Sequence, residues 1–147
     1  MSRVFLETSA LVKLYHMETG SDKVDAVIKP TDTLTISSLA RLEFISLIYK
    51  QIRKGNIAQN IAKRQLVLFQ HDMSNFHIIK YDYHIFTIAA GLLETYAPKM
   101  EITFRDVIHV ASARPLQKMG LDYYISCNST IIKLAKMEGF RTLNPLE

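Results

Sequence analysis

The sequence predicts a single α/β domain over residues 1–147, with a mostly parallel central sheet flanked by helices on both faces. Short apolar segments of strand length alternate along the chain with longer segments whose apolar residues recur at helical spacing. Strands separated by helices imply right-handed crossovers, which make neighbouring strands parallel and cover both faces of the sheet. With 147 residues, 48% of them hydrophobic, the chain has the size and composition of one domain with its own core.

The first strand and helix are predicted close to the start of the chain. Residues 3–6 form an apolar run of strand length, and the hydroxyl side chains among residues 7–9 can cap a helix over residues 10–16. Gly20 then marks a turn. The β-branched residues within 33–37 predict the second strand.

A long helix is predicted directly after the second strand. Ser38 is expected to cap it, residues 39–54 to form it, and Gly55 to end it after a last turn rich in basic residues. A second amphipathic helix is predicted from residue 56 or 57 to about residue 71. Residues 76–79 then form a short apolar segment that predicts the third strand.

The next two predicted helices lie side by side in the sequence. The first covers residues 83–96. Thr103 is expected to cap the second, which runs over residues 104–119 with a kink at Pro115 and a stop at Gly120.

The end of the chain repeats the pattern of strand, helix and strand. Residues 122–126 predict the fourth strand, and Asn128 is expected to cap a helix over residues 129–137. Gly139 ends that helix, and residues 140–143 predict the last strand.

Composition places limits on the class of protein. No window approaches the roughly 18 consecutive apolar residues of a membrane span, and no secretory signal is evident, so we expect a cytoplasmic protein without a membrane segment. Cys127 is the only cysteine, which excludes an intrachain disulfide and a thiolate zinc site. The 18 basic against 14 acidic side chains give a net charge of +4, which favours a phosphate-bearing partner if clustered and otherwise only aids solubility.

Four oxygen-bearing side chains are expected to meet at one edge of the sheet. Glu7 and Asn128 follow the first and fourth predicted strands, and ligand sites of parallel sheets lie beyond these strand ends. Glu43 and Asp106 lie near the starts of two helices. Oxygen donors of this kind suit Mg²⁺ or Mn²⁺, which can activate water and stabilise phosphate in hydrolysis.

Two of these acids have alternative interpretations. Glu43 lies in a mostly apolar helix, and a buried carboxylate needs either a cation or a nearby arginine such as Arg41 or Arg105. At helical spacing it shares a face with Leu39, Ser46 and Leu47. Asp106 taken alone is an ordinary first-turn acid, and His109, one turn later, is a core or surface histidine.

In four segments the sequence resembles the PIN-domain family, and within it the VapC-type toxins of bacterial and archaeal toxin–antitoxin operons. The segments are residues 5–15 (FLETSALVKLY), 37–43 (SSLARLE), 104–111 (FRDVIHVA) and 124–128 (YISCN). Their order and spacing cover nearly the whole chain. The resemblance therefore implies a PIN-like fold and the activity of a Mg²⁺- or Mn²⁺-dependent ribonuclease.

The resemblance also implies a set of site residues. The catalytic positions would be Glu7, Glu43, Asp106 and Asn128. The first three would hold the metal, with Thr8 and Ser126 as supporting hydroxyls; a helix cap and a strand-end residue are their alternative roles. Glu7 and Asn128 stand where the family usually has Asp: the glutamate adds about 1.5 Å of reach, and the asparagine removes one negative charge.

The partners implied are an RNA substrate, a VapB-like antitoxin and a second copy in a homodimer. The main alternative is a PIN-like protein that binds RNA or a protein partner without cleavage, because of the changes at Glu7 and Asn128. Arg105 could pair with Glu43 or hold phosphate. A nucleotide-binding Rossmann module is disfavoured because no G-x-G-x-x-G or Walker A loop is present.

Overall fold

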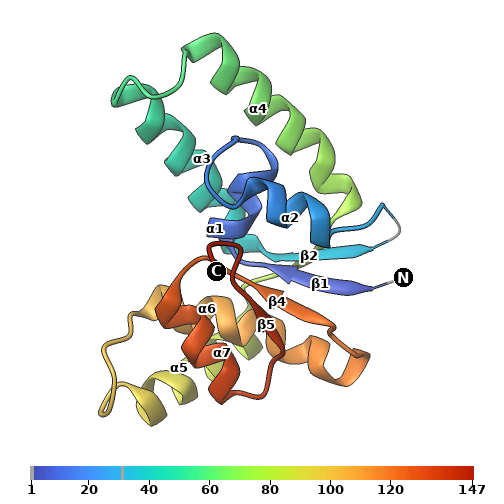
Figure 1. Cartoon of the computed structure of the whole chain (residues 1–147). Helices are drawn as coiled ribbons and strands as arrows, with labels where there is room; N and C mark the ends of the chain where they lie inside the picture. The colour runs from blue at the N-terminus through green and yellow to red at the C-terminus, as the bar shows by residue number, and fades with distance from the viewer. Residues whose placement is uncertain (1, 31) are drawn as a thin grey trace.

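The computed structural model, which describes residues 2–30 and 32–147, contains a five-stranded sheet in the order β3-β2-β1-β4-β5 (Figure 1). Every neighbouring pair of strands is parallel, which confirms the predicted α/β class. The strands are β1 (Arg3–Leu6), β2 (Thr33–Ser37), β3 (His77–Ile79), β4 (Tyr123–Ile125) and β5 (Thr142–Leu143).

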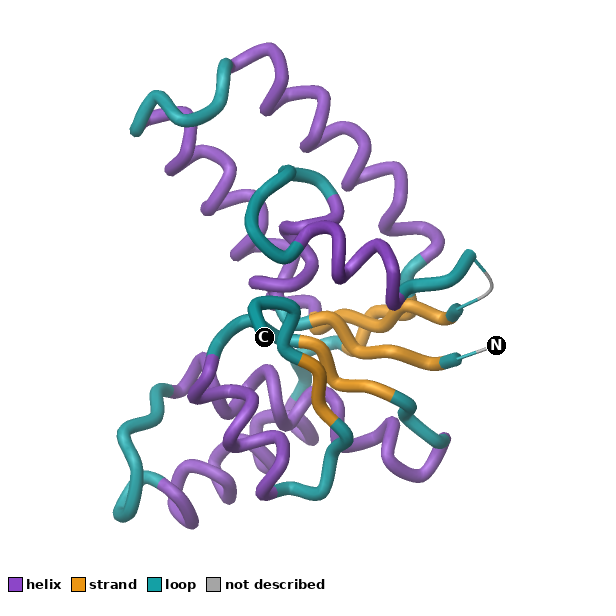
Figure 2. The backbone as a smooth tube through the Cα atoms, viewed as in Figure 1, coloured by secondary structure: helices purple, strands orange, loops and turns teal. Residues whose placement is uncertain are grey.

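Helices cover both faces of the sheet, with α1 to α4 on one side and α5 to α7 on the other (Figures 1 and 2). None of the helices in the described part of the chain is both long and apolar enough to cross a membrane. Short 3-10 segments lie at Val12–Leu14, Met73–Asn75 and Arg114–Met119. The α-helices are α1 (Thr8–Leu11), α2 (Ser21–Val27), α3 (Ser38–Arg53), α4 (Gln59–Asp72), α5 (Tyr83–Tyr96), α6 (Phe104–Ala113) and α7 (Ser129–Met137).

Side chains of the central strand alternate between two hydrophobic cores. Val4 and Leu6 are buried against the helices α1, α3 and α4. Phe5 points to the opposite face, where it stacks on Tyr124 of β4 with 5.0 Å between ring centroids, among residues of α5, α6 and α7. Burial on both faces fixes the register of β1, and so fixes the place at which Glu7 leaves the sheet.

Two predicted helix caps were wrong. The first helix is capped by Glu7, whose carboxylate accepts from the backbone N–H of Ser9, and it changes to 3-10 geometry after Leu11. The long helix is capped by Ser37, whose hydroxyl accepts from the N–H of Leu39 at 3.1 Å. The neighbouring Ser38 hydroxyl accepts instead from the backbone N–H of Tyr81.

The predicted kinked helix over residues 104–119 is two helices. Pro115 has no N–H to donate and its ring conflicts with the carbonyl of Ala111, so the α-helix ends at Ala113. A 3-10 segment continues from Arg114 to Met119. The other predicted elements exist, with ends that differ from the prediction by at most a few residues, as is usual at frayed or capped ends.

Gly20 should be the least replaceable glycine of the fold. Its φ is +93°, and an added Cβ would lie 3.2 Å from both the Pro145 carbonyl oxygen and Cε of Lys13. We expect Gly20→Ala to lower the free energy of unfolding by about 1–3 kcal/mol, measured by denaturant titration. Gly91→Ala is the matched control, because Gly91 lies inside α5 with open space around it, and alanine there should stabilise by about 0.5–1 kcal/mol. Equal effects of the two substitutions would contradict this account.

Candidate active site

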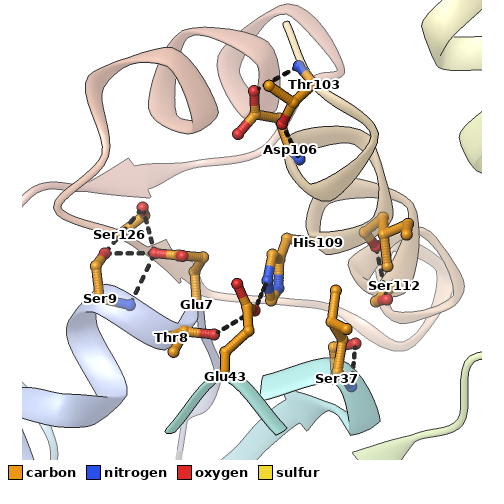
Figure 3. Close-up of polar contacts among 12 residues, drawn as sticks. Glu7, Thr8, Ser9, Ser37, Glu43, Thr103, Asp106, His109, Ser112 and Ser126 are labelled. Carbon is orange, nitrogen blue, oxygen red and sulfur yellow. Dashed lines mark hydrogen bonds and ion pairs between the residues drawn. The ribbon is translucent and has the colours of Figure 1, made fainter. Parts of the chain in front are cut away.

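Glu7 is held at the end of β1 by one of its two carboxylate oxygens. Its side chain is buried, and Oε2 accepts from the backbone N–H of Ser9 at 3.1 Å, from Oγ of Ser126 at 2.8 Å, and from Oγ of Ser9. Ser126 is in reach because Leu6 and Ile125 are paired in register, so the residues that follow β1 and β4 lie side by side. Figure 3 shows Glu7 with Ser9 and Ser126 on one side and Glu43 and His109 on the other.

Glu43 of α3 is held in the same way by a second pair of donors. Its Oε1 accepts from Oγ1 of Thr8, at 2.9 Å, and from Nε2 of His109. Thr8 belongs to α1 and the buried His109 belongs to α6, so three helices meet at this carboxylate (Figure 3). The Glu43 side chain is still 23% exposed, which leaves part of the carboxylate accessible.

The surroundings of Glu43 favour its charged form. Burial alone would raise the pKa of the carboxyl, but the hydrogen bond from His109 and its charge, the hydrogen bond from Thr8, and the charge of Arg105 together lower the pKa below its ordinary value. The expected ion pair with Arg105 is not formed within the part of the chain that the structure describes; His109 is the partner of Glu43. Arg105 acts on Glu43 only through its charge.

A pocket of about 480 Å³ is lined by both glutamates and by two basic side chains, Lys50 and Arg105. The sequence placed Glu43 on one helical face with Leu39, Ser46 and Leu47, and this is confirmed because all of them line the pocket. Its complete lining is Glu7, Thr8, Ser9, Leu39, Leu42, Glu43, Ser46, Leu47, Lys50 and Arg105. The pocket therefore brings together the carboxylates of Glu7 and Glu43 and positive charge from α3 and α6.

Asp106 and Asn128 are used as helix caps. Oδ2 of Asp106 accepts from the backbone N–H of Thr103 at 2.8 Å, which completes a capping box at the start of α6. Figure 3 shows this pair at the top of the view, away from Glu43. Oδ1 of Asn128 accepts from the N–H groups of Thr130 and Ile131 at 3.0 and 3.1 Å and caps α7, as the sequence predicted. Neither side chain lines the pocket.

Comparisons with known proteins decide the family. The sequence profile of the PIN domain matches residues 4–136. The chain belongs to the PIN-domain family. A curated relative, ribonuclease VapC46 of Mycobacterium tuberculosis, is 28% identical over 122 residues, which are 83% of this chain and 80% of the relative. The resemblance noted in the sequence is thereby confirmed.

Solved structures share the fold of this PIN domain. A toxin–antitoxin complex from Klebsiella pneumoniae contains a chain with a TM-score of 0.67 and 19% identity, and 98% of each chain is covered. VapC20 of Mycobacterium tuberculosis, described as a sarcin–ricin loop cleaving toxin, has a TM-score of 0.67 and 14% identity, with 97% of this chain and 99% of that chain covered. At these identities the likeness shows the fold alone.

The donors of the PIN-domain site suit a hard divalent cation in kind. The hydrogen bonds of the three acids use Oε2 of Glu7, Oε1 of Glu43 and Oδ2 of Asp106, so each carboxylate keeps one oxygen without a partner among the described residues. All three carboxylates also raise the pKa of the buried Tyr124 hydroxyl, after the larger effect of burial. As they stand, however, residues 2–30 and 32–147 hold no group of three His, Cys, Asp or Glu side chains close enough for a metal ion.

Sequence reasoning missed His109 and Ser9. The i, i+3 spacing from Asp106 placed His109 on the same side of α6, but nothing in the sequence indicated that α6 packs against Glu43. The sequence indicates Ser9 only as one of the hydroxyls that could cap the first helix, whereas its hydroxyl donates to Glu7 and accepts from the N–H of Cys127 at 2.8 Å. Both residues donate hydrogen bonds to the glutamates of the PIN-domain site, His109 to Glu43 and Ser9 to Glu7.

Proposed function

We propose that this protein is a Mg²⁺- or Mn²⁺-dependent endoribonuclease and the toxin of a VapBC-type toxin–antitoxin pair. The observation that carries the proposal is the pair of glutamates, Glu7 and Glu43, held by one oxygen each at a single pocket of a PIN domain. The curated relative at 28% identity is named a ribonuclease, and the two solved structures named above are described as a toxin–antitoxin complex and a toxin, which supports the same activity and an antitoxin partner.

The proposal gives each part of the pocket a task. Glu7 and Glu43 would hold the cation, and Asp106 would join them by turning from its capping box. When bound, such a cation supplies activation of the attacking water and neutralisation of phosphate charge. Thr8 and Ser126 keep the two glutamates in place by donating to them.

The basic side chains that line the pocket would attract the RNA substrate. Lys50 and Arg105 line it together with the glutamates, and a phosphodiester needs positive charge beside it because the glutamates repel it. Asn128 would occupy the fourth family position as a neutral group whose oxygen caps α7. We further propose that the protein acts in the cytoplasm on RNA, as a homodimer, and is inhibited by a VapB-like antitoxin.

A second candidate function is RNA or protein binding without cleavage. It is favoured by the capping roles of Asp106 and Asn128 and by the lack of a three-ligand group among the described residues. The double variant Glu7→Asp with Asn128→Asp separates the two candidates. If it cleaves RNA while the parent does not, the natural site is catalytically degenerate.

The proposed activity is tested by incubating a mixed RNA pool with purified protein and Mn²⁺, Mg²⁺ or a chelator. We expect cleavage with metal and none with chelator. Asp106→Ala, prepared identically to exclude a contaminating nuclease, should cleave at least about tenfold more slowly, because one metal-binding oxygen donor is removed. Equal cleavage by both proteins would point to contamination, and no cleavage by either would overturn the ribonuclease proposal.

A further inference from the structure

His109 makes a contact that packing does not explain. It is only 1% exposed on α6, and its Nε2 lies against Oε1 of Glu43 on α3. The same oxygen accepts from Thr8 on α1. One oxygen of Glu43 is therefore fixed from two sides, while its second oxygen points into the space between Glu7 and His109 (Figure 3).

The direction of the hydrogen bond follows from the charge of its acceptor. An ionised carboxylate can only accept, so Nε2 of His109 carries the hydrogen and donates it to Glu43. Nδ1 of His109 is buried and has no hydrogen-bond partner among the described residues. A buried polar nitrogen without a partner costs free energy, whereas a leucine of similar volume at this position would not incur that cost.

The geometry points to His109 as a positioning residue of the metal site. With Thr8 it holds Oε1 of Glu43, which leaves the second oxygen to face the pocket, where it would bind a divalent cation. This inference rests on the proposed function. Because Asp106 and His109 lie one turn apart on α6, a single helix would set the position of two of the three acids.

The competing account is that His109 only fills space under α3. Two variants separate the accounts. His109→Leu keeps the volume and removes the donor, whereas His109→Gln can place an amide N–H close to the position of Nε2. Ser112→Ala is the matched control, since Ser112 is equally buried on α6 and its hydroxyl donates only to the carbonyl of Ile108, at 2.7 Å.

The test is Mn²⁺ binding to the full chain, measured as the loss of the free-ion signal in electron paramagnetic resonance. Thermal unfolding of each variant in the presence of chelator checks that the variant is folded. We expect His109→Leu to bind Mn²⁺ about 10–100-fold more weakly than the parent, as is typical when a group that orients a metal ligand is removed. His109→Gln and Ser112→Ala should bind close to the parent's affinity. Cleavage rates should follow the same order.

The outcomes separate this inference from the proposed function. Unchanged Mn²⁺ affinity in a folded His109→Leu overturns the positioning role and leaves the proposed function standing. A loss in His109→Gln as large as in His109→Leu also overturns it, because the donor would then be irrelevant. If the parent itself neither binds Mn²⁺ nor cleaves RNA, the proposed function fails, and the inference fails with it.

Discussion

Replacing Phe44 with alanine is expected to lower the free energy of unfolding by about 3–5 kcal/mol. Phe44 is fully buried on α3, and its ring centroid lies 4.1 Å from that of Phe69 on α4 and 5.2 Å from that of Tyr15. Its removal would leave a cavity between rings that cannot easily collapse, because Tyr15 is also tied to Asp72 by a 2.8 Å hydrogen bond.

The measurement is urea unfolding at neutral pH, compared with Leu42→Ala on the same helix. Leu42 is 66% exposed, so its truncation should change stability by no more than about 0.5 kcal/mol. A loss below about 1 kcal/mol for Phe44→Ala would mean that α4 does not pack on α3 as described. A large loss would also show that Phe44, the residue after Glu43, anchors the helix on which Glu43 lies.

The fold could be predicted because its signals are local and repeated. Each strand of the sheet is a short apolar or β-branched run, and each long helix shows apolar residues at helical spacing. Helix ends could be predicted less well because several polar side chains compete for each cap. At residues 7–9 and 37–38 the hydroxyl expected to cap the helix was displaced by Glu7 in one case and by Ser37 in the other.

The acidic site could be predicted only in part, because strand ends and helix faces are readable while packing between helices is not. Glu7, Glu43 and Thr8 were expected at one site, and they line one pocket. Asp106 and Asn128 were expected to join them, but first-turn and N-cap positions give a side chain a local partner before any distant one. Their roles as site residues therefore stay predictions.

Glu43→Gln is expected to reduce metal-dependent RNA cleavage by about 100- to 1,000-fold, since several kcal/mol of stabilisation by a bound cation would be weakened. Glu43 faces the pocket, whereas Asp106 is turned toward its own helix, so the loss should exceed that of Asp106→Ala. The control is Glu94→Gln on the exposed side of α5, which removes the same charge away from the site. Cleavage by Glu43→Gln at the parent's rate would remove Glu43 from the site.

The same variant carries a stability prediction whose sign follows from the pKa of Glu43. The folded protein lowers the pKa of this carboxyl below its ordinary 4.5, so the ionised form stabilises the fold above that pH, and the contribution is lost as the pH falls through the lowered value. Glu43→Gln lacks this contribution, so the parent should be the more stable protein at neutral pH. The difference in unfolding free energy should shrink in acid, below the ordinary pKa. If the difference in unfolding free energy between the parent and Glu43→Gln is instead constant with pH, His109 and Thr8 do not stabilise the charged form of Glu43. Their hydrogen bonds would then orient the side chain without favouring its ionisation.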